Sequence, residues 1–396
     1  MCNGNSARVL SWDFGEASAK GDSYLSTVNK IKLTGVVDGK DCQVSIVVKS
    51  LPKNLGRRKT FRSTEFFYNE IIFYTKIVPK FKEFLDAKDQ DHVLCIPRCL
   101  ASVLDGENDF IVLEDVSVLG YRPVSRQNCI NVTECAMLLR TMAKFHAISF
   151  AYKDQKKAEF KEIIENLHET YFDDKHWEWY KNFQKNLIGI ASNALSLEYP
   201  GHVAQHRFAS YKLGELFEIC KEFCSRKNAP TSVVSQGDSW APNFLARNTN
   251  DNERNALMLD FQLARCTSPI LDLSFCLYSC TDKKLWDNRF DEMLKLYHSE
   301  LANTISLLGS DPEKLYSWNT FMNEVKEQFV FGLTFAIEAV PFSILDESES
   351  FDLDALIKDD NGVDVADVFR VKNITSKDGR LRLANIIVHA VERGFL

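Results

Sequence analysis

The sequence lacks the features that would place the chain in or on a membrane. No apolar run approaches the roughly 18 residues that a membrane-spanning helix needs. The N-terminal stretch, MCNGNSARVLSWDFGEASAKG, has no apolar core of the kind found in signal peptides, and Cys2 stands where a myristoylated chain has glycine. We therefore predict a cytoplasmic protein without a membrane partner.

Other absences narrow the function further. There is no excess of positive charge, because 48 basic residues against 55 acidic ones give a net charge of −7, and we predict no nucleic-acid partner. The 11 cysteines are scattered and have no histidines at zinc-finger spacing, which favours reduced, buried thiols. There is no internal repeat, and 396 residues exceed what one compact core usually serves, so one bilobal unit or two domains is expected.

The first third of the sequence is typical of a small sheet with one helix. Residues 24–37 and 42–50 are rich in β-branched residues and are separated by Asp38-Gly39, a dipeptide suited to a tight hairpin turn. The other elements predicted in this part are a helix over residues 63–84 and a buried strand over residues 110–113.

From about residue 131 the pattern becomes mostly helical. Apolar side chains recur at helical spacing in NVTECAMLLRTMAKFHAISF and again in residues 287–308 and 320–340. We therefore predict an α+β fold with two lobes. Residues 1–115 would form a small antiparallel-sheet lobe with one helix that binds the nucleotide, and residues 116–396 a large, mainly helical lobe that binds the acceptor.

An acidic stretch covers residues 346–367. A calcium loop aligned on Gly362 would need a ligand at Ile357 and a closing glutamate where Val368 stands, so it fails both requirements. We predict a solvated loop here.

The strongest chemical signal is VVSQGDSWAPNFL, followed by ALMLDFQLARCTSPILDLSFCL. In each segment an apolar, strand-like run leads into a polar cluster. Phosphoryl transfer explains the set: Asp238 would orient the acceptor hydroxyl and take its proton, while Asn243 and Asp260 would hold magnesium against the phosphates. Each of these residues alone could be a turn residue or a helix cap, but the combination favours catalysis.

Two more residues would complete a nucleotide site. Lys49 ends a predicted strand on the face opposite its apolar neighbours, from which it could reach phosphates. Glu70 lies within the apolar stripe of the helix at residues 63–84, whereas Glu65 is about half a turn away. A carboxylate on an inward face needs a positive partner, and we predict that Lys49 provides it. An edge glutamate that reaches water is the alternative.

Weaker signals extend the predicted ATP site. Gly21, Asp22 and Ser23 belong to KGDSYLS, which could form the turn that covers the phosphates, although it contains one glycine only. Glu114 and Asp115 follow the strand at residues 110–113, where a linker backbone would bind adenine.

The motifs together resemble the insect ecdysteroid kinase-like family, which is related to choline kinases and aminoglycoside phosphotransferases. The matching segments are spread over nearly the whole chain: IVVKSLP, FFYNEIIFYTKIVPKF, IVLEDVSVLGYRPVSR, LLRTMAKFHAISF, SQGDSWAPNFL, LDFQ, SPILDLSFCL and the terminal RGFL. The resemblance implies a bilobal protein-kinase-like fold, ATP with Mg²⁺, and transfer to a hydroxyl of an ecdysteroid or a related apolar molecule. It also implies that His146 and Asp272 are structural.

The sequence departs from this family at Gln236. Such kinases usually have histidine before the Gly-Asp pair, where it braces the catalytic loop by hydrogen bonds. Glutamine can also donate and accept, so we expect it to brace the loop. A catalytically silent ATP- or steroid-binding protein is the main alternative. A protein kinase is disfavoured, because the seven residues between Asp260 and Ser268 leave no room for a long activation loop. The acceptor pocket is expected near Trp240 and the aromatic segments 170–183 and 320–342.

Overall fold

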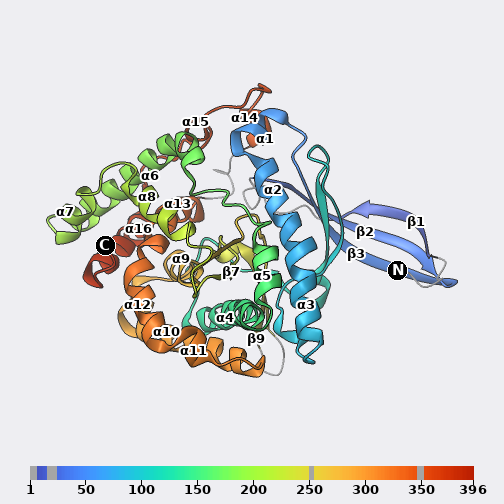
Figure 1. Cartoon of the computed structure of the whole chain (residues 1–396). Coiled ribbons are helices and arrows are strands. Elements are labelled where there is room, and N and C mark those ends of the chain that lie inside the picture. Colours follow the sequence, from blue (N-terminus) through green and yellow to red (C-terminus); the bar gives the residue numbers. More distant parts are fainter. Residues whose placement is uncertain (1–6, 16–24, 249–253, 346–351) are drawn as a thin grey trace.

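The computed structural model describes residues 7–15, 25–248, 254–345 and 352–396. Its first part is a five-stranded antiparallel sheet in the order β1-β2-β3-β5-β4, and the strands β1 to β3 extend away from the rest of the molecule (Figure 1). The strands are β1 (Ala7–Phe14), β2 (Thr27–Val37), β3 (Lys40–Ser50), β4 (Cys99–Val103) and β5 (Phe110–Glu114).

The predicted hairpin is confirmed. Asp38 and Gly39 have φ angles of 51° and 78°, so both central residues of the turn adopt the left-handed conformation that matches the twist of the flanking strands. In the register that follows, Lys49 lies opposite Val28 on one side and opposite Ile111 on the other. Lys49 is therefore in the middle of the sheet and not at its edge.

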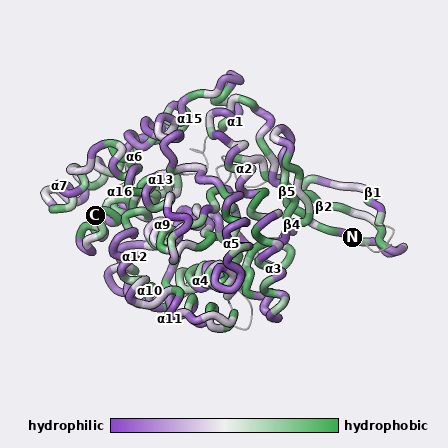
Figure 2. Tube along the Cα trace, viewed as in Figure 1, coloured by the Kyte–Doolittle hydropathy of each residue, from purple (hydrophilic) through white to green (hydrophobic). Residues whose placement is uncertain are grey.

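One long helical run packs against this sheet. It consists of α2 (Ser63–Ile72), a π-helical turn η1 (Phe73–Ile77) and α3 (Val78–Asp86), and it confirms the helix predicted over residues 63–84. The short helix α1 (Leu55–Phe61) precedes it, capped by the side chain of Asn54. Hydrophobic residues run along β4 and β5 next to α3 (Figure 2).

The second part is mainly helical. Its long central helix α4 (Val132–Gln155) begins with a capping box, in which Asn131 and Glu134 satisfy each other's backbone N–H groups. The other helices are α5 (Lys157–Ile164), α6 (Trp177–Glu198), α7 (Val203–Ala209), α8 (Glu215–Cys224), α9 (Ile270–Cys280), α10 (Lys283–Leu307), α11 (Pro312–Tyr316), α12 (Trp318–Gln328), α13 (Val330–Ser343), α14 (Leu353–Leu356), α15 (Val365–Val368) and α16 (Lys377–Glu392).

Five short strands lie among these helices. They form two small antiparallel sheets, one of β7 with β10 and one in the order β6-β8-β9. Their bounds are β6 (Arg122–Pro123), β7 (Val233–Ser235), β8 (Phe244–Asn248), β9 (Arg254–Met258) and β10 (Arg265–Thr267). Sheet and helices together make the α+β, bilobal arrangement predicted from the sequence, while the division at residue 115 stays a prediction. Within the described residues, no helix is long and apolar enough to cross a membrane.

The solvated loop predicted over residues 346–367 is observed in part where the structure describes this stretch: residues 358–361 are exposed, whereas Leu353, Ile357 and Val365 are buried. Two short helices, α14 and α15, flank this exposed turn and lie beside α1 at the top of Figure 1. Ile357 is fully buried, and its carbonyl accepts a hydrogen bond of 2.8 Å from the side chain of Asn54. The N–H of Val363 donates to the hydroxyl of Thr60 over 2.9 Å. Apolar residues between the acidic ones therefore dock this late segment onto a helix of the first lobe.

Candidate active site

Two loops meet at the ends of the short strands. Residues 236–243 connect β7 to β8, and residues 259–264 connect β9 to β10. Because β8 pairs antiparallel with β9 and β7 with β10, both loops leave the strands at the same end. The N–H of Leu259 donates to the carbonyl of Asn243 over 2.8 Å, which ties the loops together. The three polar residues predicted from the two motifs therefore lie in neighbouring loops.

Asp238 and Asn243 are in direct contact. The amide nitrogen of Asn243 donates to the carbonyl of Asp238 over 2.9 Å and to its carboxylate over 2.8 Å. With its nitrogen used in this way, Asn243 keeps its amide oxygen as a ligand atom. Burial, and then the negative charge of Asp260, raise the pKa of Asp238 to about 7.

Asp260 joins the two lobes through Lys49. The Lys49 Nζ atom lies 3.0 Å from the carboxylate of Asp260 and 2.7 Å from that of Glu70. The predicted pairing of Lys49 with Glu70 is therefore observed. The backbone of Asp260 has a φ of 56°, a left-handed conformation that aspartate adopts more readily than most residues.

The charges in this cluster do not balance. Desolvation lowers the pKa of Lys49, but the carboxylates of Asp260 and Glu70 outweigh it, so the pKa is raised and the lysine stays charged. Burial raises the pKa of Glu70 and the charge of Asp260 adds to this effect, although Lys49 opposes both. One ammonium thus faces two carboxylates, which leaves a place for further positive charge.

Glu65, the alternative partner for Lys49, lies elsewhere. Its carboxylate is 2.6 Å from the guanidinium of Arg62 and 3.7 Å from the ring of His176. It is also half exposed, whereas Glu70 is buried. The apolar stripe of the helix therefore identified the inward glutamate correctly.

Gln236 braces both loops at once. Its amide nitrogen donates to the carbonyls of Leu259 and Asp260, over 2.7 and 3.0 Å. Its amide oxygen accepts from the N–H of Asp238 and from the hydroxyl of Ser239, both over 2.9 Å. All four hydrogen-bonding positions of the amide are used, and the side chain is fully buried. Glutamine thus holds the aspartate of one loop in register with that of the other.

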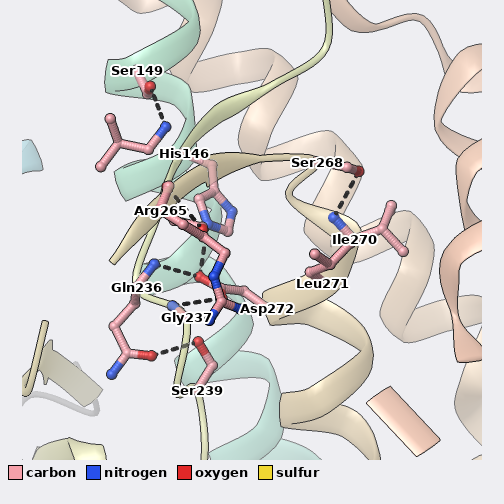
Figure 3. A network of polar contacts seen from close by, with 12 residues as sticks. His146, Ser149, Gln236, Gly237, Ser239, Arg265, Ser268, Ile270, Leu271 and Asp272 are labelled. Atoms are coloured by element: carbon pink, nitrogen blue, oxygen red, sulfur yellow. Dashed lines mark hydrogen bonds and ion pairs between the residues drawn. The ribbon is translucent and has the colours of Figure 1, made fainter. Parts of the chain in front are cut away.

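The carboxylate of Asp272, on α9, supports the same loop from the side (Figure 3). It accepts from the N–H groups of Gln236 and Gly237, over 2.7 and 2.9 Å, and lies 3.2 Å from the ring of His146. Gly237 has a φ of 87°, and a Cβ atom there would stand 1.9 Å from the carbonyl oxygen of Leu263, so this position requires glycine. His146 and Asp272 position the catalytic loop, in agreement with a structural role.

Phe261 anchors the residue next to Asp260. Its ring stacks on Phe73 of the π-helical turn, with centroids 3.8 Å apart and planes within 7°. Tyr74 and Phe145 pack around the same ring, and Phe261 is fully buried. The acidic loop is thereby fixed to helices of both lobes.

Of the other residues predicted to contact the nucleotide, the structure describes only Glu114 and Asp115. Gly21, Asp22 and Ser23 lie outside the described residues. The N–H groups of Glu114 and Asp115 are already bonded, to the carbonyls of Arg98 and Ser45 over 3.0 and 3.3 Å.

The side chains of this pair are also engaged. Glu114 accepts from Arg98 over 2.8 Å, and Asp115 caps the next turn by accepting from Ser117. Val116 is the next residue along the chain, and in the described part of the structure no partner is found for its N–H. Of these three neighbouring residues, Val116 is therefore the one whose N–H has no partner within the described residues, and the adenine contacts of Glu114 and Asp115 stay a prediction.

An apolar cavity opens beside Asp238. It lies where the sequence analysis expected an acceptor pocket, near Trp240 and the aromatic segments. Larger surface hollows exist elsewhere, but none of the site residues lines them. The residues that line the cavity are Leu25, Phe61, Phe66, Tyr171, Trp179, Phe183, Asp238, Trp240, Leu263, Phe275, Phe335, Glu338, Ala339, Phe342, Val365 and Phe369.

Sequence reasoning did not single out Glu338, the second carboxylate in the cavity. Its carboxylate accepts from the hydroxyls of Tyr171 and Tyr180, over 2.6 and 3.0 Å. The available signal was its isolation, because it is the one charged residue in the helix sequence VFGLTFAIEAVPFS. Such a residue inside an apolar helix marks a position that needs a polar partner.

Comparisons with known proteins place the chain beside one protein family and several solved structures. The sequence profile of the ecdysteroid kinase-like family matches residues 20–310. The similar solved structures include an ethanolamine kinase from Plasmodium vivax, at 12% identity and a TM-score of 0.40 over 98% of this chain and 82% of that one. The GDP complex of aminoglycoside 2'-phosphotransferase-IIIa gives 12% identity and a TM-score of 0.43 over 96% and 93%. A search of curated proteins found no match.

The two lobes and the residues that meet between them define a phosphotransferase that acts on an alcohol group, of the small-molecule kinase type. The family match covers well over half of the sequence. The chain belongs to the ecdysteroid kinase-like family.

Proposed function

We propose that this protein is an ATP-dependent kinase that transfers the γ-phosphoryl group to a hydroxyl of an apolar small molecule, such as an ecdysteroid or a related alcohol. The observation that carries the proposal is the convergence of Lys49 from the sheet, Glu70 from the long helix and Asp260 from the loop after β9. Phosphoryl transfer depends on positioning and on neutralising charge more than on covalent chemistry. Lys49 supplies one positive charge, and the excess of carboxylates could hold the cation that supplies more.

The donor set suits Mg²⁺. Magnesium usually takes one or two protein ligands together with phosphate oxygens and water. Asn243 offers its amide oxygen and Asp260 its carboxylate, and the excess negative charge around Lys49 favours a cation. When bound, the metal would neutralise the charge of the phosphates. Lys49 would then bind phosphate oxygens while Glu70 keeps it in place.

Asp238 would act on the acceptor. It lines the apolar cavity and is oriented by Asn243 and, through the backbone, by Gln236. As the acceptor oxygen forms its bond to the γ-phosphorus, the O–H proton would pass to the Asp238 carboxylate and the bond to ADP would break. The N–H of Val116 would face the adenine, in place of Glu114 and Asp115.

A catalytically silent binding protein is the rival interpretation. Its support is Gln236, which replaces the usual histidine. The four hydrogen bonds of this glutamine argue against a loosened loop, because they hold Asp238 and the carbonyl of Asp260 together. An intact brace favours an active enzyme.

Two measurements test the proposal. The first incubates the protein with magnesium-ATP and a panel of ecdysteroids and plant alcohols, and seeks phosphorylated products by mass. The second compares thermal unfolding with and without magnesium-ATP for the wild type, for Asp260→Ala and for a control, Asp287→Ala, which removes a surface carboxylate on α10 paired with Lys283. Wild type and control should be stabilised by the nucleotide, and Asp260→Ala much less. A wild type that shows neither product nor stabilisation would overturn the proposal.

A further inference from the structure

One face of α13 forms a wall of the cavity. Phe335, Glu338, Ala339 and Phe342 recur at spacings of three and four residues, so they lie on the same side of the helix. Three of them are apolar. Glu338 is the exception, and it is one of two carboxyl groups in the lining, the other being that of Asp238.

Glu338 has hydrogen-bond partners but no cationic one. Tyr171 donates to one oxygen of its carboxylate and Tyr180 to the other. Burial raises the pKa of both phenols well above their usual range, and the charge of Glu338 adds to this, so they remain donors. In the described part of the chain no Lys, Arg or His lies within ion-pair distance of Glu338, and none lines the cavity.

A carboxylate oxygen has more than one acceptor position, and each oxygen of Glu338 uses one for a tyrosine. The other positions are open to a ligand, because Glu338 lines the cavity. A carboxylate removed from water without a full set of partners is destabilising, and desolvation raises the pKa of Glu338 to about 7. A ligand that donates to this group would relieve that penalty.

We propose that Glu338 binds a second hydroxyl of the acceptor, so that the substrates of this protein are apolar molecules with at least two hydroxyls, one at Asp238 and the other at Glu338. The proposal rests on the kinase function proposed above and adds its substrate class. It makes Glu338 a specificity-determining residue and not a catalytic one.

The chemistry of the cavity favours a hydroxyl over an ammonium group as the donor. A hydroxyl loses less hydration on entering an apolar cavity than an ammonium ion does. Its bond also survives a change in the protonation of Glu338, because it can donate to the carboxylate or accept from the carboxyl.

The experiment measures binding apart from turnover. Trp179 and Trp240 line the cavity, so their fluorescence can follow a titration in the absence of nucleotide. The probes are ecdysone, a series of its analogues that each lack one hydroxyl, the monohydroxy steroid pregnenolone, and choline. Each probe is titrated into the wild type, Glu338→Gln and the control Glu324→Gln.

Glu324 is a matched control because it is also a carboxylate that accepts from hydroxyls. It receives hydrogen bonds from Thr231, Ser268 and Tyr316 over 2.5 to 2.6 Å, but it does not line the cavity. Glu324→Gln should therefore alter the thermal stability and leave the affinity for ecdysone unchanged.

We expect Glu338→Gln to weaken ecdysone binding about tenfold or more, the usual effect of losing a hydrogen bond to a charged group. The analogue that lacks the hydroxyl bound by Glu338 should bind the wild type as weakly as ecdysone binds Glu338→Gln. The Glu338→Gln variant should bind this analogue and ecdysone with equal affinity. If Glu338→Gln does not fold, the wild-type series still decides the matter, because the loss of one particular hydroxyl must weaken binding.

Three results would overturn the proposal. They are equal affinity of ecdysone for wild type and Glu338→Gln, equal binding of pregnenolone and ecdysone by the wild type, and a preference for choline over every steroid. Phosphorylation of the same probes is measured in parallel. A wild type that binds ecdysone through Glu338 but phosphorylates nothing would remove the proposed kinase function and leave the hydroxyl contact intact.

Discussion

The two sides of Asp238 use acidic residues in opposite ways. Toward the sheet, Asp260 and Glu70 both lie within 3.0 Å of the Lys49 ammonium group. Toward the cavity, Glu338 has two tyrosine hydroxyls, and none of the described residues forms an ion pair with it. The first arrangement suits highly charged phosphates and a metal, and the second suits a neutral molecule. The position of Lys49 therefore distinguishes the proposed nucleotide site from the proposed acceptor site.

The largest effect should come from Asp238, which both sides share. Asp238→Asn keeps the size of the side chain and removes the base, so turnover should fall by roughly 10²–10⁴. Affinity for magnesium-ATP should change far less, because Asp238 faces the cavity. Steady-state kinetics with a nucleotide-binding titration separate the two quantities. Near-normal turnover in the variant would exclude Asp238 from the chemistry.

The charged cluster toward the sheet can be tested by mutating the pair formed by Lys49 and Glu70. Removing Lys49 leaves the buried Glu70 carboxylate without its cation, and removing Glu70 leaves Lys49 held by Asp260 alone. The double variant Lys49→Met with Glu70→Gln should therefore lose less nucleotide affinity than the two single losses added together. Glu65→Gln, on the same helix but paired with Arg62, is the control and should bind nucleotide normally. Strict additivity would show that the pair does not act as a unit.

Substitutions of Gln236, which joins the two loops, should reduce turnover to different extents. Gln236→Ala leaves four hydrogen-bonding groups without a partner and should reduce turnover most. Gln236→His retains one donor and one acceptor, so we expect a change within about tenfold. The comparison uses turnover of the three proteins on one acceptor. An inactive wild type that Gln236→His activates would mean that this protein is a silent binder.

The smallest effect concerns stability and pH. The pKa of both Asp238 and Glu338 is raised to about 7 in the folded protein, mainly by burial. The folded state therefore holds these protons more tightly than the unfolded chain, and stability is lost as pH rises from about 4 to about 7. Asp238→Asn and Glu338→Gln remove this loss.

Without ligands, the wild type should therefore lose more stability than these two variants when the pH is raised from 5 to 8. The Tm of each variant minus the Tm of the wild type should be larger at pH 8 than at pH 5 by about 2 °C or more. Unfolding scans at both pH values measure these four temperatures for each pair of proteins. A difference of Tm that does not change with pH would contradict the raised pKa values.

Much of the site could be predicted from the sequence because its signals are local. The hairpin follows from Asp38-Gly39, and the inward direction of Glu70 follows from the helical period. The strand β1 gave no such signal, because all of its described side chains are exposed and no apolar face distinguishes it. The adenine contacts predicted at Glu114 and Asp115 stay a prediction, and a pattern in one segment could not show that both N–H groups are bonded to Arg98 and Ser45.

The acceptor side depends on contacts that are distant in sequence. The two tyrosines bonded to Glu338 precede it by 167 and 158 residues, so no local pattern could reveal the carboxylate as part of a cavity. The docking of residues 352–369 onto α1 has the same origin, because the acidic residues dominate the composition while Ile357 and Val365 make the buried contacts. Local sequence therefore specified the catalytic groups better than the walls around them.

The stacking of Phe261 on Phe73 has a consequence for regulation. Kinases that are switched by movement of the metal-binding loop need that loop to leave its place. Here the residue after Asp260 is held in an aromatic cluster from two lobes, and Gln236 holds the carbonyl of Asp260 from the other side. Displacing the loop would expose a buried phenylalanine and break a saturated amide network. We therefore expect the activity of this protein to follow the supply of its substrates and its own abundance, without a covalent switch in the loop.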